Sequence, residues 1–225
     1  MQSPSLLKSQ QLGTLFEQRS ILLKTRSRTV SDDAKAGSAI VLAAGFSRRF
    51  GRDKRLEPLG QDTLLTHTCR LYTAIFDRVV AVLRPGEFEI ASLLPESVEV
   101  VPSTRAIEGI SRSLVAGVRA AIDSPWIVVA LGDMPYVKKS TLGLLRSTLE
   151  TCNEHVVRLK HSDRVGNPVG FPSKYFDSLL GLTGDNGAKA LLESGSLKSQ
   201  VLVVDDPGIL VDLDHPDDLQ AQTDC

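Results

Sequence analysis

The sequence predicts an α/β protein built on a single doubly wound, mostly parallel sheet, with a small antiparallel part in its second half. Short apolar runs alternate with amphipathic segments between Ser38 and Leu149, as buried parallel strands and their covering helices do. A loop rich in glycine and basic residues directly follows the first apolar run. The chain has 225 residues, 42% apolar and 24% charged, which suits one globular domain with a substantial core.

The expected elements of the first half follow from the local pattern. Strands are expected where apolar and β-branched residues run together, at residues 38–43, 78–83, 98–101 and 126–131. Helices are expected where apolar residues recur every three or four positions, at residues 62–72, 88–94, 110–121 and 140–149. Ser140 or Thr141 is the expected N-cap of the last of these helices.

The second half of the chain alternates less regularly. Residues 155–160 and 165–171 are expected to form an antiparallel pair, followed by a helix at 187–193. Two short strands at 201–204 and 209–213 then lead into a final helix that starts near Pro216. Residues 1–36, rich in Ser, Gln, Lys and Arg, are expected to be an extension, either a mobile tail or a helix over about residues 5–24. The folded domain is expected to span residues 37–225.

Composition excludes several classes of function. The formal net charge of −1 gives no electrostatic reason to expect a nucleic acid or a membrane as partner. No apolar run approaches the ~18 residues of a membrane-spanning helix, and no secretory signal is recognisable. The three cysteines, Cys69, Cys152 and Cys225, are scattered, which argues against a disulfide framework or a zinc site. A cytoplasmic protein is therefore expected; the sequence does not indicate its oligomeric state.

The loop after the first strand is the most informative stretch of the chain. It carries Gly45, Ser47 and Gly51 together with three arginines and Lys54, so backbone N–H groups and cations can surround phosphates. Five residues separate the two glycines and Arg55 follows the lysine, so the spacing is not that of a Walker loop. The G-x-G-x-x-G spacing of dinucleotide-binding enzymes is also absent. The loop predicts a different way of gripping nucleotide phosphates.

Asp133 is the candidate metal ligand. It directly follows the apolar run that ends at Leu131, and ligands of such sheets lie at the carboxyl ends of the strands. The Gly45 loop and Asp133 are therefore expected at the same edge of the sheet. Carboxylate and phosphate oxygens are the ligands that Mg²⁺ prefers. The alternative is an aspartate that caps a turn before Pro135.

The loop resembles the signature L-A-A-G-x-S-x-R-M-G-x-x-K of the MobA-like nucleotidyltransferases. Gly-Asp-Met-Pro around Asp133 matches the same family. The resemblance implies a Rossmann-like fold of the nucleotide-diphospho-sugar transferase type. It also implies that Arg49 and Lys54 neutralise the triphosphate, whereas Arg48, Arg52 and Arg55 are expected to be solvated surface charges. Phe50 and Glu57 depart from the family pattern; the matching residues are Leu42, Ala43, Ala44, Gly45, Ser47, Arg49, Gly51 and Lys54.

Two further segments resemble elements of this family around its substrates. The first is G-x-S-x-S-L, which in the family helps to enclose the nucleotide; a helix cap is the alternative interpretation. The second is G-[HN]-P-x-x-F near the acceptor, in which Gly170 stands where a larger apolar residue is common; a turn in a hairpin is the alternative. The candidate residues are Gly109, Ser111 and Ser113 for the nucleotide, and Gly166, Asn167 and Pro168 for the acceptor.

Two more segments complete the resemblance. G-D-x-G-A-[KR] supplies Asp185, Gly187 and Lys189, where a helix N-terminus can bind an acceptor phosphate or be capped by the aspartate. In the C-terminal element, Asp212 and Asp214 are expected to alternate along a strand and share a face. Either can complete the Mg²⁺ site opposite Asp133; Asp212 is the preferred ligand and Asp214 the preferred cap of the final helix.

Together these resemblances imply Mg²⁺-dependent nucleotidyl transfer to a phosphorylated pterin, the molybdenum cofactor, with a molybdoenzyme or its chaperone as a further partner. Ala44 in the loop is more similar to the molybdopterin cytidylyltransferase branch, which implies CTP as donor. A guanylyltransferase with the same acceptor remains an alternative, as does a nucleotidyltransferase for a sugar phosphate or another small phosphorylated metabolite. The third alternative is a non-catalytic nucleotide-binding or cofactor-handover protein.

Overall fold

The computed structural model describes residues 36–47, 50–152, 154–185, 187–214 and 218. The expected N-terminal extension lies outside these residues, apart from Ala36, and so does the start of the expected final helix at Pro216. Arg48 and Arg49 of the signature loop also lie outside them. The fold and the site are therefore built from the remaining part of the chain.

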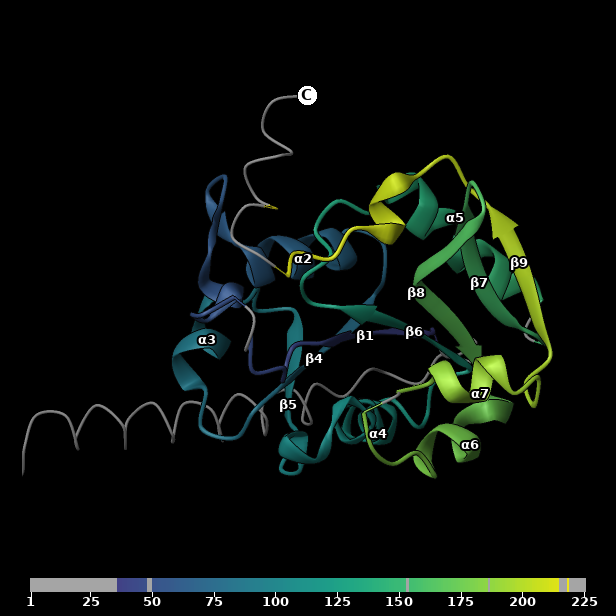
Figure 1. Ribbon diagram of the computed structural model, residues 1–225, viewed down its shortest axis with the longest axis horizontal. Helices are drawn as coiled ribbons and strands as arrows, with labels where there is room; N and C mark the ends of the chain where they lie inside the picture. Colours follow the sequence, from purple (N-terminus) through teal and green to yellow (C-terminus); the bar gives the residue numbers. More distant parts are fainter. Residues whose placement is uncertain (1–35, 48–49, 153, 186, 215–217, 219–225) are drawn as a thin grey trace, which may run out of the picture.

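A seven-stranded sheet in the order β5-β4-β1-β6-β8-β7-β9 forms the centre of the molecule (Figure 1). Strands β5, β4, β1 and β6 are parallel to one another, and β8 runs antiparallel to both of its neighbours, β6 and β7. This arrangement confirms the expected doubly wound sheet with an antiparallel part in the second half. The strands are β1 (Ser38–Leu42), β4 (Arg78–Leu83), β5 (Val98–Pro102), β6 (Trp126–Leu131), β7 (Val156–His161), β8 (Arg164–Pro172) and β9 (Ser199–Val203).

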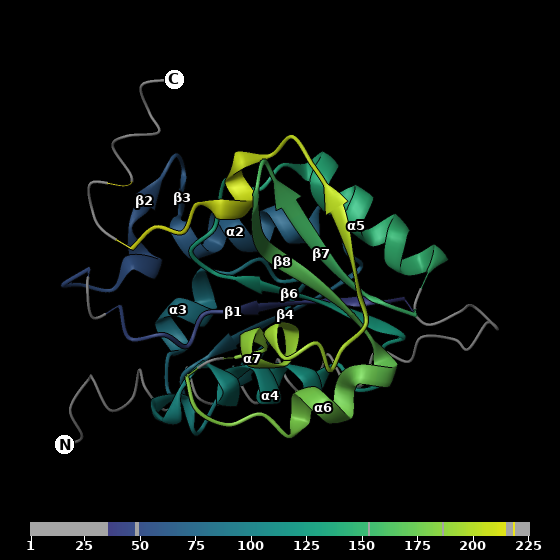
Figure 2. The same cartoon turned by 45° about the vertical axis from the view of Figure 1, so that its right-hand side comes forward.

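Helices cover both faces of the sheet (Figures 1 and 2). On one face, Leu65 of α2 and Leu142 of α5 pack in an apolar cluster with every second residue of β1. On the other face, Leu114 of α4 and Phe176 of α6 pack in a second cluster with the intervening residues of β1. Burial on both faces explains why the central strands are continuous apolar runs. Among the described residues, no helix has the length and apolar character needed to cross a membrane. One face carries α2 (Leu64–Thr73), α3 (Phe88–Leu93) and α5 (Lys139–Thr151), and the other carries α4 (Ile110–Ala120), α6 (Phe176–Leu180) and α7 (Lys189–Glu193).

The functional edge of the sheet lies where β1 and β6 end side by side. Leu42 and Leu131, the last residues of the two strands, are paired in register. The backbone N–H of Gly132 continues the ladder by donating to the carbonyl oxygen of Leu42 at 2.9 Å. From β1 the chain passes to β4 on one side, while β6 lies on the other, so a ligand crevice is expected at this point. The topology therefore brings the signature loop and Asp133 to one edge, as the sequence predicts.

Several elements differ from the sequence predictions. Residues 209–213 do not form a strand: a 3-10 helix, η4 (Pro207–Leu210), is followed by irregular backbone. Helix α7 begins at Lys189 rather than at residue 187. Helix α6 and a hairpin of β2 (Pro58–Leu59) and β3 (Asp62–Thr63) were not predicted, because segments of two to five residues are too short for a periodic pattern.

The expected cap of α5 is also wrong, because an aspartate distant in the sequence performs this role. The structure places Lys138 rather than Ser140 or Thr141 at the N-cap position. The backbone N–H of Lys138 donates to the carboxylate of Asp206 at 2.8 Å, and the backbone N–H of Gly208 donates to the same carboxylate at 3.0 Å. Asp206 therefore ties the start of α5 to the start of η4.

Replacing Asp206 with alanine is expected to lower the free energy of unfolding by about 1–3 kcal/mol, because two N–H groups around a fully buried residue lose their acceptor. Urea unfolding measures the loss. Asp205→Ala is the matched control, since the neighbouring side chain is exposed. Equal losses in the two variants would contradict a structural role for the Asp206 carboxylate.

Candidate active site

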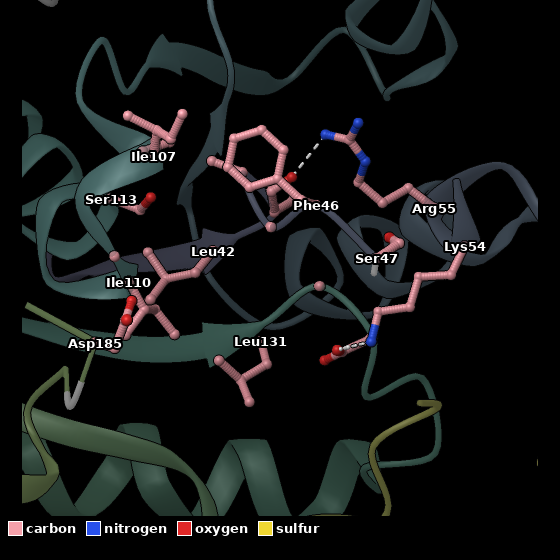
Figure 3. A pocket seen from close by; sticks show the side chains of 17 residues that line it. Leu42, Phe46, Ser47, Lys54, Arg55, Ile107, Ile110, Ser113, Leu131 and Asp185 are labelled. Carbon is pink, nitrogen blue, oxygen red and sulfur yellow. Dashed lines mark hydrogen bonds and ion pairs between the residues drawn. The ribbon is translucent and has the colours of Figure 1, made fainter. Parts of the chain in front are cut away.

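A cavity of about 310 Å³ opens beside the ends of β1 and β6. The signature loop forms one wall, the start of α4 another, and the Gly132–Asp133 corner a third (Figure 3). These three elements come from separate parts of the chain, and their meeting agrees with the expected nucleotide site. The expected residues that line the cavity are Leu42, Ala43, Ala44, Gly45, Ser47, Lys54, Gly109, Ser113 and Asp133.

Lys54 links the two sides of this cavity through its ammonium group. The residue begins the short 3-10 helix η1 (Lys54–Leu56), and its Nζ lies 2.6 Å from Oδ2 of Asp133 and 2.9 Å from Oδ1 of Asp214. Nζ also donates to the carbonyl oxygen of Leu213 at 2.9 Å. Burial alone would lower the pKa of Lys54, but the two carboxylates raise it above its ordinary value, so the ammonium stays charged at neutral pH.

Asp133 presents a free oxygen as well as a paired one. Its Oδ1 atom is buried and has no hydrogen-bond partner within the described part of the chain, although Oδ2 contacts Lys54. Burial raises the pKa of the Asp133 carboxyl above its ordinary value, although the adjacent Lys54 ammonium opposes the rise. A carboxyl group with an unused buried oxygen beside an ammonium is suited to bind a cation that replaces part of its lost hydration.

The donor set fits Mg²⁺ better than a metal held by protein alone. Among the described residues, no group of three or more His, Cys, Asp and Glu side chains is arranged to hold a metal. Mg²⁺ does not need such a cage, because one or two carboxylates together with waters and substrate phosphates satisfy its coordination. Asp133 and Asp214, which share the Lys54 ammonium, are the carboxylates that would hold the ion.

The C-terminal aspartates are placed differently from the sequence prediction. Asp214 contacts Lys54 beside Asp133, whereas the preferred ligand Asp212 is exposed and lies on irregular backbone. The expected shared strand face is wrong, because no strand forms there. Asp212 still raises the pKa of Asp133 through its negative charge. The geometry favours Asp214 over Asp212 as the second metal ligand, which remains a prediction.

The cavity has a charged end and a mostly apolar end. Figure 3 shows Lys54 at the first end, and Ile107, Ile110 and Ser113 together with the carboxylate of Asp185 at the other. Ile107 is 76% exposed, and Phe46, at 43% exposure, lies under the Arg84 guanidinium at 4.8 Å from its ring centroid. Sequence reasoning missed Phe46 and Ile107 because single apolar residues in loops leave no periodic signal. The arrangement suits phosphates at one end and a flat base at the other.

Arg55 is buried, and the expectation that it is a solvated surface charge is wrong. Its guanidinium is 2.6 Å from Asp53, is paired closely with Glu87, and donates to the carbonyl oxygen of Ala43 at 2.7 Å. The Arg55 side chain thus stabilises the start of the signature loop through its hydrogen bond to Ala43. Arg52 agrees with the expectation, since its side chain is 62% exposed, although it also pairs with Glu57.

Three of the expected nucleotide-binding and acceptor-binding residues are absent from the linings of the two adjoining cavities at this edge of the sheet. Ser111 is fully buried, and its backbone N–H donates to the carbonyl oxygen of Gly184 at 3.2 Å. Gly51, with a φ of 77°, shapes the signature loop without lining the cavity. Pro168 is also absent from the lining of the acceptor-side cavity. These residues support the fold of the site rather than its surface.

A second cavity of about 400 Å³ adjoins the first and holds most of the expected acceptor residues. The two cavities share the lining residues Leu42, Ile110, Leu131 and Asp185. Gly170, whose departure from the family pattern bears on the acceptor, does not line this cavity. A Cβ atom there would meet Leu149 of α5 at 2.6 Å, so the glycine serves packing. The expected acceptor residues that do line it are Gly166, Asn167, Asp185, Gly187 and Lys189.

The expected phosphate site at the helix following Gly187 is not built as predicted. Helix α7 spans only Lys189–Glu193 and begins two residues later than expected. A helix of one turn carries a weak dipole, because few peptide units are aligned. Gly187 and Lys189 contribute to the cavity wall, and their contact with an acceptor phosphate stays a prediction.

Gly109 lines the first cavity beside Asp185, which lines both cavities, and it has no room for a side chain. Its φ is 115°, and a Cβ atom would lie 2.3 Å from Oδ1 of Asp185 and 2.5 Å from the carbonyl oxygen of Gly184. We expect Gly109→Ala to lower the free energy of unfolding by about 1–3 kcal/mol and to displace Asp185. Thermal unfolding measures the first effect.

The matched control for this variant is Gly143→Ala on α5, where an added Cβ atom meets nothing within 4 Å. Alanine there is expected to raise the unfolding free energy by about 0.5–1 kcal/mol, because glycine is unfavourable inside a helix. Opposite signs for the two variants would agree with the close approach at Gly109. An unchanged stability of Gly109→Ala would contradict it.

Comparison with known proteins identifies the class of the chain. Residues 39–201 match the MobA-like NTP transferase domain, so the chain belongs to this family of nucleotidyltransferases, and the resemblance of its motifs is confirmed. The purine catabolism protein PucB of Bacillus subtilis is 31% identical over 193 residues, which cover 80% of this chain and 92% of PucB. A probable molybdenum cofactor guanylyltransferase of Synechococcus elongatus is 32% identical over 119 residues, 52% of this chain and 60% of that protein.

A solved structure shares both the fold and part of the sequence. The crystal structure of Rv0371c from Mycobacterium tuberculosis, in complex with manganese, superposes with a TM-score of 0.62 and 27% identity. The match covers 76% of this chain and 89% of that protein. The similarity agrees with the Rossmann-like architecture of the sheet.

Proposed function

We propose that the protein transfers a nucleotidyl group, CMP by preference, from a nucleoside triphosphate to the terminal phosphate of a molybdopterin-type cofactor, with release of pyrophosphate. One observation carries the proposal: Lys54 and Asp133 form a charged pair at one end of a cavity whose far end is lined mainly by apolar side chains, with Ser113 and Asp185 beside them. The charged end suits a triphosphate with its metal, and the apolar end suits a base. The adjoining cavity offers room for the acceptor.

The reaction needs positioning and charge neutralisation more than proton transfer. An oxygen of the acceptor phosphate attacks the α-phosphorus, a new P–O bond forms, and the bond from the α-phosphorus to the bridging oxygen breaks. Pyrophosphate leaves with the electron pair of that bond. A phosphate nucleophile is already ionised at neutral pH, so no general base is required. Lys54 holds negative charge of the triphosphate, and backbone N–H groups around Gly45 bind its oxygens.

Mg²⁺ is the proposed metal, held by Asp133 and Asp214. When bound, it would neutralise charge on the phosphates and make the α-phosphorus more electrophilic. The unused Oδ1 atom of Asp133 supports this assignment. The manganese in the Rv0371c structure is a divalent ion bound to a related protein, and it also supports a divalent-metal requirement.

The preferred base is inferred from the signature loop, which, with Ala44 before Gly45, resembles the loop of the cytidylyltransferase branch more than that of the guanylyltransferase branch. A guanylyl donor is the second candidate, and it is favoured by the relative from Synechococcus elongatus that is named a molybdenum cofactor guanylyltransferase. Both candidates use the same residues for the phosphates. The difference lies at the apolar end of the cavity, near Ile107 and Ser113.

Pyrophosphate release tests the proposal, with Mg²⁺, the molybdopterin-type cofactor and CTP, GTP, ATP or UTP in separate reactions. Release that depends on the cofactor and is greatest with CTP is the expected result. A preference for GTP would support the proposed acceptor but would show that the nucleotide donor is GTP rather than CTP. No release with any nucleotide, from protein shown to bind one, would contradict the proposal and favour a sugar-phosphate acceptor or a handover protein.

A further inference from the structure

Arg158 lies on β7, between β8 and β9, and its side chain lines the acceptor-side cavity. The Nε atom is buried and has no hydrogen-bond partner within the described residues. No ion pair joins Arg158 to any carboxylate of that part of the chain. Arg55, a buried arginine near the nucleotide cavity, is paired with two carboxylates and a carbonyl oxygen. Arg158 therefore differs from this paired arginine.

A partly buried guanidinium without a counter-charge is unfavourable, because its lost hydration is not replaced. The planar group presents N–H donors in a fixed fork that matches the two oxygens of a carboxylate or a phosphate. In a cavity walled by Leu114, Val169 and Phe171, such a contact is strengthened by the apolar surroundings. A ligand oxyanion would supply the partner that the chain does not.

The other charged groups of this cavity do not supply that partner. Glu193 pairs with Lys189 at 3.7 Å, and both side chains are mostly exposed. Asp185 lies at the border with the nucleotide cavity, where its Oδ1 is close to Gly109. The amide of Asn167 adds a neutral hydrogen-bonding group to the same wall. Arg158 is thus a cationic side chain that a strand of the central sheet contributes to the lining of this cavity.

The position of Arg158 separates it from the reacting groups. Asp133 and Lys54 line the nucleotide cavity and are absent from the lining of the second cavity. Arg158 lines only the second. We propose that Arg158 binds an oxyanion of the acceptor, a phosphate or a carboxylate, in this second cavity. The term acceptor rests on the proposed function, whereas the anion site rests on the cavity and its arginine.

Direct binding tests the site without relying on activity. The Nε–H resonances of the arginines are recorded by ¹H–¹⁵N NMR in protein saturated with CTP and Mg²⁺, and the Arg158 resonance is assigned from its loss in Arg158→Gln. Inorganic phosphate and acetate are titrated in separate experiments, which show whether Arg158 binds a phosphate or a carboxylate. A saturable shift of the Arg158 resonance with either anion is expected. No shift with either would overturn the proposal.

Kinetics then connect the site to the acceptor. Arg158→Gln is expected to raise KM for the molybdopterin-type cofactor roughly tenfold or more, with KM for CTP unchanged, because a charge-assisted contact is lost only on the acceptor. Arg158→Lys should recover part of the loss. Lys160→Gln is the matched control on the same strand, since Lys160 faces Asp163 and does not line the cavity.

The failure of this proposal can be told apart from failure of the proposed function. Equal KM values for the cofactor in wild type and Arg158→Gln would contradict a role of Arg158 in acceptor binding. If the wild type transfers no nucleotide, the proposed function fails and the NMR titration alone decides the anion site. Thermal unfolding of Arg158→Gln should occur no earlier than in wild type, because the variant removes a partly buried charge that has no ion-pair partner among the described residues. An earlier midpoint would indicate a structural arginine instead.

Discussion

Asp133→Ala is expected to lower the rate of nucleotidyl transfer at least ~100-fold while the protein remains folded. The carboxylate contacts Lys54 through one oxygen and leaves the other buried and unused. The variant removes the proposed metal ligand, whereas Lys54 keeps its contacts with Asp214 and the carbonyl oxygen of Leu213. The loss should therefore fall on the chemical step and on metal dependence rather than on folding.

Initial rates of pyrophosphate release at several Mg²⁺ concentrations measure this effect. Asp77→Ala is the matched control, because Asp77 is an exposed partner of Arg146 and contributes to neither cavity. Circular dichroism and thermal unfolding confirm that each variant is folded. A folded Asp133→Ala variant with near-normal turnover would reject Asp133 as the metal ligand.

Arg55→Leu is expected to lower the free energy of unfolding by about 3 kcal/mol or more, the largest stability effect that we anticipate. Leucine removes one of the two arginines that pair with Asp53 and Glu87, leaving Arg84 alone with both carboxylates, and it leaves the carbonyl oxygen of Ala43 without its donor. Urea unfolding at pH 7 measures the loss. Arg52→Leu, at an exposed arginine with one carboxylate partner, is the control, and its loss should be much smaller because exposed ion pairs contribute little to stability.

The same network predicts how stability depends on pH. Hydrogen bonds from Arg55 lower the pKa of Asp53, although burial opposes this. For Glu87, burial acts to raise the pKa, but hydrogen bonds from Arg55 and Arg84 outweigh it, so the pKa is lowered. Carboxylates with lowered pKa values stabilise the fold above their unfolded values of about 4, and this contribution is lost as the pH falls through the folded values.

The difference in unfolding free energy between wild type and Arg55→Leu should therefore shrink as the pH falls from 7 toward about 3. Urea unfolding at a series of pH values measures it. A difference that stays constant across this range would contradict the ionic origin of the stabilisation. It would instead indicate that packing of the arginine stem carries the effect.

Much of the fold was predictable because its central strands are buried on both faces. The predicted bounds of β4 and β6 agree with the structure, since continuous apolar runs are bordered there by polar residues. The edge of the sheet at which the signature loop and Asp133 meet followed from topology alone. The sequence also indicated the antiparallel pair of β7 and β8, though not the short helix α6.

What sequence reasoning missed depends on contacts between distant residues. The Asp206 carboxylate accepts a hydrogen bond from the start of α5, and the buried Arg55 guanidinium pairs with Glu87. Neither contact can be recognised from a local sequence pattern, because the partners are distant in the sequence. The sequence favours Asp214 as a cap because it precedes the expected final helix, yet its carboxylate contacts Lys54. Arg158 lies in a strand that also carries Lys160 and His161, and only the cavity beside it distinguishes it from a surface charge. Long-range geometry, rather than residue type, assigns these roles.

The central claim is that the cavity beside Lys54 and Asp133 supports nucleotidyl transfer. The most direct test follows radioactive phosphorus from CTP labelled at either the α- or the γ-position, with Mg²⁺ and the molybdopterin-type cofactor. We predict that the α-label appears in the modified cofactor and the γ-label in pyrophosphate, and that Asp133→Ala abolishes both. Release of the γ-label as free phosphate, with the α-label remaining in a nucleoside diphosphate, would contradict the account.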